Sequence, residues 1–339
     1  MAGEFELIAR HFTRPARRAA IVSDAGAERV ALASGAGAQR VALGVGDDCA
    51  LLNMVPGQQL AVSSDMLVEG RHFLSTVAPE RLGHKALAVN LSDLAACGAE
   101  PLAFTLALAL PRADEAFVAP FARGLFALAD EHGIELMGGD TTAGPLNICI
   151  TVFGQVPPGQ ALLRSGANAG DDLWVSGLLG DARLALEVFR GSVALPGEQF
   201  EAVRRAMEQP QPRVALGIAL RGVATSAIDL SDGLLGDLGH VLQRSQVGAT
   251  VHVDALPRSA VLTALPQALQ HECLLAGGDD YELLFTAAAA SRDAVCAAAA
   301  AASVAVTRCG VIDAAPGLRV VDTQGHRVAT PWRAFDHFA

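Results

Sequence analysis

The chain has 339 residues, of which 51% are hydrophobic and 18% charged, enough for two domains that each bury a core. The formal net charge at pH 7 is −11 and no basic stripe offsets it, so we expect no nucleic acid among the partners. Lys85 is the sole lysine, which excludes a Walker A loop, since that loop requires a lysine after its glycines. An anionic ligand would therefore be held through metal ions, helix N-termini and a few arginines.

The N-terminal segment 1–12 carries Glu4 and Glu6 and has no long apolar core, which is not typical of a signal peptide. The longest strand-like apolar run, 102–110, is too short to span a bilayer. We therefore expect a soluble cytoplasmic protein with no membrane partner. The six cysteines are widely spaced and include no Cys-x-x-Cys pair, a pattern that favours buried free thiols over disulfides or a zinc site.

Strands and helices alternate along the first half of the chain. In chain order, the pattern predicts a helix at 7–12, a loop at 22–38, strand structure at 39–52 with the Gly-Asp-Asp turn inside it, and a strand at 59–64. It then predicts a helix at 79–98, a strand at 101–110, a helix at 115–132, and strands at 134–137 and 147–156. The helix at 79–98 is opened by a proline and closed by a glycine, as helix ends prefer. The loop at 22–38 is rich in alanine and glycine.

Pro157-Pro158-Gly159 indicates a joint between two domains, 1–156 and 160–339. In chain order, the second half is predicted to contain a strand at 172–176, helices at 181–189 and 211–222, a strand at 226–228, a helix at 234–246, strands at 250–253 and 281–286, a helix at 291–302 and a strand at 304–308. Helices that cover a mixed sheet in each half indicate an α/β or α+β class, twice over.

Aspartates recur in short turns flanked by glycine or serine. These turns are Gly46-Asp47-Asp48, Ser63-Ser64-Asp65, Gly138-Gly139-Asp140, Asp229-Leu230-Ser231-Asp232-Gly233 and Gly277-Gly278-Asp279-Asp280. Most of them follow apolar runs, so their carboxylates are expected at the ends of strands. Such turns suit Mg²⁺, because a hard cation prefers oxygen ligands and keeps waters and phosphates in its shell. One turn of this type would indicate an ordinary loop, but five are hard to explain by surface solvation.

Within the expected helix 79–98, Ala86, Asn90, Asp93 and Cys97 fall on one stripe by the three-and-four spacing. Asn90 and Asp93 would be costly to bury without polar partners. The alternative, a solvated face, is disfavoured because the flanking residues are so apolar.

Together these segments resemble the thiamine-monophosphate kinase family. The matching stretches are Gly-Asp-Asp-Cys-Ala-Leu-Leu from Gly46, Ser-Ser-Asp-Met-Leu-Val-Glu-Gly-Arg-His-Phe from Ser63, Lys-Ala-Leu-Ala-Val-Asn-Leu-Ser-Asp-Leu-Ala-Ala from Lys85, Gly-Gly-Asp-Thr-Thr from Gly138, Leu-Leu-Arg-Ser-Gly-Ala from Leu162, Ala-Ile-Asp-Leu-Ser-Asp-Gly-Leu from Ala227, Gly-Gly-Asp-Asp-Tyr-Glu-Leu from Gly277 and Phe-Asp-His-Phe from Phe335. They occur in order from residue 3 almost to the C-terminus, which makes the resemblance specific.

The resemblance implies a two-domain fold similar to aminoimidazole ribonucleotide synthetase, with N-terminal sheets that pair across a homodimer and a C-terminal α/β domain that covers the nucleotide. It implies direct, in-line transfer of the γ-phosphoryl of ATP onto thiamine monophosphate, with no phosphoenzyme. Bringing two phosphate-bearing anions together in an acidic site would require several Mg²⁺ ions that bridge phosphate oxygens to carboxylates. No covalent nucleophile is expected.

Carried over position by position, the resemblance implies magnesium ligands at Asp48, Ser63, Ser64, Asp65, Asp93, Asp140, Asp229 and Asp232. It implies ATP contacts at Gly139, Asp140, Arg164 and Ser231, and substrate contacts at His72, Asp279 and Phe335, with Trp332 as a second aromatic candidate. The family more often has Gly-Gly-Glu-Asp where this chain has Gly-Gly-Asp-Asp, so Asp279 is a shortened carboxylate. Without the resemblance, Arg164 would be interpreted as a surface arginine and His72 as a structural histidine.

Other functions of the same superfamily fit the sequence less well. A hydrogenase-maturation carbamoyl dehydratase usually ends in a reactive cysteine, whereas the last cysteine here is Cys309. A selenophosphate synthetase carries a cysteine or selenocysteine in an N-terminal glycine-rich loop, and the segment 35–37 has neither. Aminoimidazole ribonucleotide synthetase itself is a further alternative. A non-catalytic protein that binds a nucleotide or thiamine phosphate would be expected to lose metal carboxylates, and none is lost.

Overall fold

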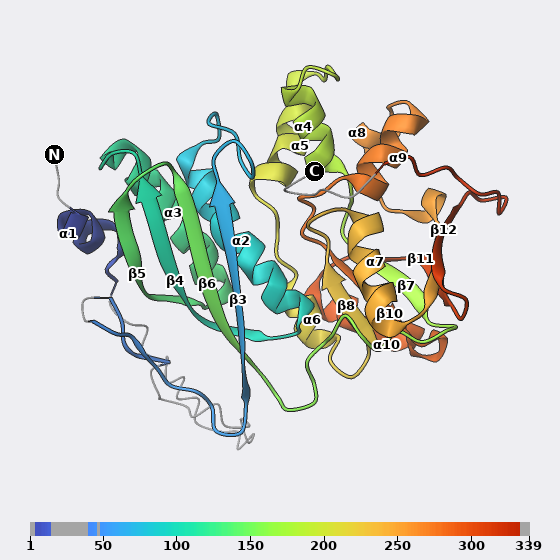
Figure 1. Cartoon of the computed structure of the whole chain (residues 1–339), viewed down its shortest axis with the longest axis horizontal. Helices are drawn as coiled ribbons and strands as arrows, with labels where there is room; N and C mark the ends of the chain where they lie inside the picture. Colours follow the sequence, from blue (N-terminus) through green and yellow to red (C-terminus); the bar gives the residue numbers. More distant parts are fainter. Residues whose placement is uncertain (1–3, 15–39, 46–47, 333–339) are drawn as a thin grey trace, which may run out of the picture. The chain divides into compact units, whose positions relative to one another are not determined.

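The structure is a computed structural model that describes residues 4–14, 40–45 and 48–332 (Figure 1). The expected loop at 22–38 and the candidate substrate residue Phe335 lie outside the described residues. The chain divides into two compact units. The first comprises Met1–Asn90 and Glu100–Gly159, and the second comprises Leu91–Ala99 and Gln160–Ala339.

The first unit is built on a four-stranded sheet of order β3-β6-β4-β5, in which β4 and β5 are parallel and the other pairs antiparallel. The strands are β3 (Gln59–Val68), β4 (Glu100–Leu110), β5 (Glu135–Ala143) and β6 (Asn147–Val156). A short hairpin of β1 (Val41–Leu43) and β2 (Leu51–Leu52) precedes them. Helices α2 (Pro79–Ala96) and α3 (Glu115–His132) lie along one face of the sheet (Figure 1).

The two helices of this unit cross with their backbones in close approach. A Cβ atom at Gly83 of α2 would lie 2.0 Å from the Phe121 carbonyl oxygen, and one at Gly124 of α3 would lie 1.8 Å from that of Glu80. Both positions therefore require glycine. The predicted helix at 115–132 is confirmed at both ends. The Asp114 carboxylate accepts from the Ala116 N–H at 3.0 Å, and Gly133 ends the helix with φ 63°.

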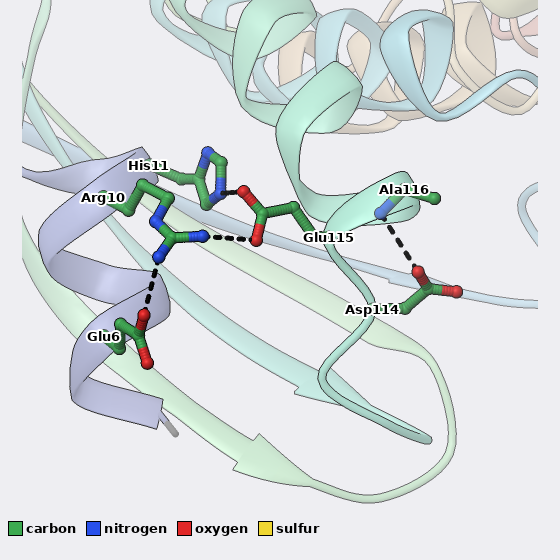
Figure 2. A network of polar contacts seen from close by, with 6 residues as sticks. All are labelled: Glu6, Arg10, His11, Asp114, Glu115 and Ala116. Atoms are coloured by element: carbon green, nitrogen blue, oxygen red, sulfur yellow. Dashed lines mark hydrogen bonds and ion pairs between the residues drawn. The ribbon is translucent and has the colours of Figure 1, made fainter. Parts of the chain in front are cut away.

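The N-terminal segment, α1 (Glu4–Leu7) and η1 (Ile8–Phe12), is attached to the start of α3 through Glu115 (Figure 2). Arg10 Nη1 lies 2.6 Å from Glu115 Oε2, and His11 Nε2 lies 3.2 Å from Glu115 Oε1. A second guanidinium nitrogen of Arg10 contacts Glu6 at 2.6 Å. The hydrogen bond from Arg10 holds the pKa of Glu115 below its ordinary value.

The second unit contains a six-stranded sheet of order β12-β9-β11-β7-β10-β8, antiparallel except for the pair β12–β9. Its strands are β7 (Asp172–Ser176), β8 (Ser226–Asp229), β9 (Gly248–His252), β10 (Leu283–Ala287), β11 (Val306–Asp313) and β12 (Gly317–Val321). Its helices are α4 (Asp181–Phe189), α5 (Gly197–Glu208), α6 (Val214–Ala219), α7 (Leu234–Ser245), α8 (Ala260–Thr263), α9 (Gln267–Ala276) and α10 (Arg292–Ala302), with 3₁₀ turns at η2 (Val253–Ala255) and η3 (Ala289–Ser291).

Several predicted boundaries were wrong. Strand β3 continues four residues past Ser64 because it pairs with β6 along its whole length. The strands predicted on the two sides of the acidic turn in 39–52 are confirmed, although β1 and β2 are short. The predicted helix 211–222 is shortened to α6. Helices α5 and α9 and strand β12 were not predicted. The two sheets flanked by helices confirm the mixed α/β class.

All six cysteines are free, as predicted, but only Cys273 and Cys309 are buried. The expected burial is wrong for Cys49 and Cys296, which are exposed. Among the described residues, no helix combines the length and apolar character needed to cross a membrane.

Candidate functional site

Strand β3 carries three of the candidate magnesium ligands. Ser63 and Asp65 are half-buried and Ser64 is exposed, because successive side chains of a strand point to opposite faces of its sheet. The Ser64 hydroxyl lies 3.0 Å from Thr151 Oγ1 and donates to the Ile150 carbonyl oxygen at 3.2 Å. The structure thus places Ser63 and Asp65 on one face of β3 and engages the Ser64 hydroxyl with β6.

Helix α2 supports β3 through Asn90, which is fully buried. Its Oδ1 accepts from the Asp65 N–H at 3.1 Å, and its amide group donates to the Ala86 carbonyl oxygen at 3.0 Å. These partners remove the cost of burying the amide, and they exclude the solvated-face interpretation for Asn90. Asp93, one turn further along the helix, is half-buried.

His72 lies in the turn that follows β3, and its position is fixed from two sides. Its Nδ1 accepts from the Val68 N–H at 2.9 Å, and its carbonyl oxygen accepts from Lys85 Nζ at 3.2 Å. Because Nδ1 is an acceptor, the proton of the neutral ring is on Nε2. Lys85 is 2% exposed, so the single lysine of the chain is a buried support of this turn.

Strand β5 carries Gly139 and Asp140. Gly139 has φ 144°, and a Cβ atom there would lie 1.9 Å from the Leu106 carbonyl oxygen of β4, so this position requires glycine. Asp140 is exposed on the same strand. Asp48 is also exposed, in the segment between β1 and β2.

In the second unit, Asp229 ends β8 and is 5% exposed. Its Oδ2 accepts a hydrogen bond of 2.8 Å from the Ser92 hydroxyl, and the Ser92 side chain is fully buried. Residues 91–99 belong to this unit, so the end of α2 orients Asp229. Sequence reasoning did not identify Ser92, although it stands directly before the candidate ligand Asp93.

The turn from Asp229 to Gly233 leads into α7. Asp237, near the start of that helix, fixes the turn through hydrogen bonds. Asp237 Oδ2 accepts from the backbone N–H groups of Asp232 and Gly233, each at 3.1 Å. Burial raises the pKa of Asp237 to about 7. Sequence reasoning missed this residue too. Its signal was a carboxylate on the buried face of an amphipathic helix, directly after an acidic turn.

The segment before β10 pairs with this turn. The Asp279 N–H donates to the Ser231 carbonyl oxygen at 2.9 Å, and the Tyr281 N–H donates to that of Leu230 at 2.8 Å. Asp279 has φ 67° and Tyr281 φ 50°, left-handed conformations that non-glycine residues rarely adopt and that are often found at functional sites. The structure therefore brings the candidate substrate residue Asp279 beside the candidate nucleotide residue Ser231.

Arg164 is exposed in the segment between β6 and β7, where it lines a cavity with residues of α7. Trp332 is half-buried and packs against the hydrophobic core of the second unit. Of the two aromatic candidates, only Trp332 lies among the described residues.

The candidate metal ligands are carboxylates and hydroxyls, a donor set that suits Mg²⁺ rather than zinc or copper. Across residues 4–14, 40–45 and 48–332, no three His, Cys, Asp or Glu side chains gather into a group that could hold a metal ion. Mg²⁺ is commonly bound by one or two carboxylates together with waters and substrate phosphates. The donor chemistry therefore fits a magnesium ion that arrives with a phosphate-bearing ligand.

Comparison with known proteins assigns the family. Residues 46–156 match the N-terminal domain of AIR synthase related proteins, and residues 158–323 match their C-terminal domain. The thiamine-monophosphate kinase of Salmonella typhimurium (strain LT2) is 43% identical over 342 residues, covering 99% of this chain and 98% of its own.

Two solved structures share the fold. The thiamine-monophosphate kinase from Stenotrophomonas maltophilia K279a is 48% identical, with a TM-score of 0.79 over 83% of this chain and 91% of that chain. AaThiL complexed with AMPPCP and TMP is 28% identical, with a TM-score of 0.74 over 84% of this chain and 89% of that chain. The fold, its acidic turns and these likenesses together show that the chain belongs to the thiamine-monophosphate kinase family of AIR synthase related proteins.

Proposed function

We propose that this protein transfers the γ-phosphoryl group of ATP onto thiamine monophosphate and so forms thiamine diphosphate. The observation that carries the proposal is the 43% identity over nearly the full length to a thiamine-monophosphate kinase. A solved relative with the same fold is complexed with AMPPCP and TMP, which supports ATP and thiamine monophosphate as the two substrates. Hydrogen bonds at the Asp229–Gly233 turn support the same function. They orient the Asp229 carboxylate and fix the Asp232 backbone, where a metal ion bound to phosphate would be held.

Residues of this chain would hold several magnesium ions. They are Asp48, Ser63, Ser64, Asp65, Asp93, Asp140, Asp229 and Asp232. When bound, the ions would neutralise negative charge on the phosphate oxygens. For Ser64 the contact would be made while its hydroxyl also bonds β6.

Each remaining residue has a definite task in this proposal. Ser92 keeps Asp229 in one orientation through its hydrogen bond. Asp237 keeps the Asp232 turn closed by accepting from two of its N–H groups. His72 would donate from Nε2 to the acceptor substrate, since its Nδ1 is already an acceptor. Gly139, Arg164 and Ser231 would contact ATP, and Asp279 with an aromatic residue, Trp332 or Phe335, would contact the thiamine moiety.

We also propose a homodimer formed through the first unit. Strand β3 is at the edge of its sheet, and Leu60, Val62 and Met66 on its outer face are 50%, 54% and 53% exposed. An edge strand with an apolar face is a site for pairing with another chain, and a two-fold dimer presents the same patch from both sides. A cytoplasmic location fits both the free thiols and the proposed use of ATP.

The test is an ADP-release assay coupled to a reporter reaction, run side by side with thiamine monophosphate, thiamine and an aminoimidazole precursor as acceptors. Turnover should require thiamine monophosphate, ATP and magnesium, with little activity on free thiamine. Equal or greater turnover of thiamine would contradict the assignment. Preference for the aminoimidazole precursor would favour the superfamily alternative.

A further inference from the structure

A cavity of about 690 Å³ in the second unit has a strongly basic lining: Arg164, His240, Gln243 and Arg244. The last three residues stand at positions i, i+3 and i+4 of α7, so they share one exposed face of the helix. The opposite face of α7, with Leu238 and Val241, is buried in the core of the unit. The cavity therefore rests on a rigid element.

The arginines of this cavity differ from most others in the unit. Among the described residues, neither Arg164 nor Arg244 forms an ion pair with a carboxylate, whereas Arg183, Arg213 and Arg292 each do. Two guanidinium groups that face one cavity repel each other, and in a chain of net charge −11 carboxylates are plentiful. Their charges are therefore available to an anionic ligand, for which a planar guanidinium is well suited.

The backbone that carries Arg164 is fixed on both sides. The Ser245 hydroxyl, at the end of α7, accepts from the N–H groups of Gly166 at 3.1 Å and Ala167 at 3.2 Å and donates to the Arg164 carbonyl oxygen at 3.3 Å. On the other side, the Leu163 carbonyl oxygen accepts from the Ala227 N–H of β8 at 2.9 Å. One serine thus ties the Arg164 segment to the helix that carries Arg244.

A simpler explanation covers part of this arrangement. Arginine in the last turn of a helix interacts favourably with the negative end of the helix dipole, and Arg244 is in the last turn of α7. That effect does not account for Arg164, which comes from a separate segment, or for the three hydrogen bonds of Ser245. It also does not explain a cavity whose volume lies within the range of roughly 300–1,000 Å³ typical of small-molecule sites.

We infer that Arg244 and His240 complete with Arg164 a binding site for the phosphate groups of the nucleotide, and that Ser245 is the positioning residue for Arg164. Gln243 adds an uncharged hydrogen-bond donor to the same wall. The inference rests on the proposed ATP-dependent function, because Arg164 is one of the expected ATP contacts. It adds three residues of α7 and one positioning serine to that contact.

The experiment compares Arg244→Gln with Arg205→Gln, which alters an exposed arginine of α5 that lies outside the cavity and has no ion pair among the described residues. Affinities for AMPPCP and for thiamine monophosphate are measured separately by calorimetry, at two salt concentrations. Arg244→Gln should weaken AMPPCP binding about tenfold, the scale of one charged hydrogen bond, and flatten its salt dependence. Thiamine monophosphate affinity should not change, and Arg205→Gln should alter neither.

Ser245→Ala tests the positioning role. It should raise the KM for ATP several-fold and leave the KM for thiamine monophosphate unchanged, while Ser245→Thr, which keeps the hydroxyl, should restore the KM for ATP. A general loss of folding would instead change both KM values and lower the Tm. In that case Ser245→Thr would not restore the KM for ATP alone.

The outcomes distinguish failure of this binding site from failure of the proposed function. If the Arg244→Gln variant binds AMPPCP as well as the wild-type protein does, the inference is overturned and the proposed function stands. Weaker binding of thiamine monophosphate alone would assign the cavity to the acceptor phosphate and also overturn it. Wild-type protein that binds no AMPPCP would contradict the proposed function and the inference together.

Discussion

The Ser92 hydroxyl donates a hydrogen bond of 2.8 Å to Oδ2 of Asp229, although the two residues are 137 positions apart in the chain. Both side chains are buried, Ser92 fully and Asp229 to 5% exposure. A carboxylate that ligates a metal is commonly held by a hydrogen bond of this kind, which fixes its orientation. In the proposed function Asp229 is a magnesium ligand, so Ser92 would act on metal binding without touching the ion.

Ser92→Ala should therefore raise the magnesium concentration for half-maximal turnover by about tenfold, the lower end of the effect of such supporting contacts. The reason is that Asp229 loses the partner that fixes its orientation. Turnover is measured as a function of magnesium concentration, and the melting temperature serves as the folding control. An unchanged magnesium dependence would show that Ser92 only satisfies a buried carboxylate.

Asp65→Asn and Asp93→Asn should each abolish most turnover. Each substitution keeps the size of the side chain but removes a carboxylate that the proposed function assigns to Mg²⁺. We expect at least about a hundredfold loss of kcat at low magnesium, with partial recovery when magnesium is raised. Near wild-type turnover at low magnesium in both variants would mean that these carboxylates are structural. Asp130→Asn, on the exposed face of α3, provides a matched control.

The sequence was sufficient for elements whose ends carry local signals. Asp114 and Gly133 delimit α3 by a side-chain cap and a left-handed glycine, and both are visible in the chain. Strand β12 could not be found in the same way, because it is specified by parallel pairing with β9, more than sixty residues earlier. Its short length gives no periodic pattern of its own.

The same distinction between local signals and distant contacts applies to the residues of the candidate site. The aspartates were found because each stands in a recognisable turn. Ser92 and Ser245 were not found, since their roles come from contacts with residues 137 and about eighty positions away. Ser64 shows a related limit. Its neighbours Ser63 and Asp65 share its motif, but strand pairing decides which hydroxyl bonds β6, and that pairing is not a local property of the sequence.

The attachment of the N-terminal segment to α3 should depend on pH. The pKa of Glu115 is lowered in the folded chain, chiefly by the hydrogen bond from Arg10, so the ionised form is the one stabilised. The contribution is therefore present above the ordinary pKa of a glutamate and is lost as the pH falls through the lowered value. Hydrogen exchange of residues 6–12 should accelerate at acidic pH and in Glu115→Gln at neutral pH. Glu131→Gln, in the same helix, should leave it unchanged.

Thiol reactivity should follow burial. Burial raises the pKa of Cys273 and of Cys309 to about 12, so at pH 8 both are protonated and inaccessible. Cys49 and Cys296 are exposed. A thiol reagent should label these two rapidly in the native protein and reach Cys273 and Cys309 only after unfolding, which mass spectrometry of the labelled peptides would resolve. Rapid native labelling of Cys309 would contradict its placement in β11.

The proposed dimer predicts a specific sensitivity of the β3 face. Val62 is 54% exposed on the outer face of β3, between Leu60 and the exposed Ser64, and its neighbour across the sheet is Phe153. Val62→Asp should shift the protein from a dimer to a species of 34.9 kDa in light scattering, because a buried unpaired charge on each side of a two-fold contact is strongly unfavourable. Leu178→Asp, at a residue of similar exposure in the second unit, should leave the dimer intact. Wild-type protein that is monomeric and fully active at assay concentrations would exclude the dimer as a requirement of function.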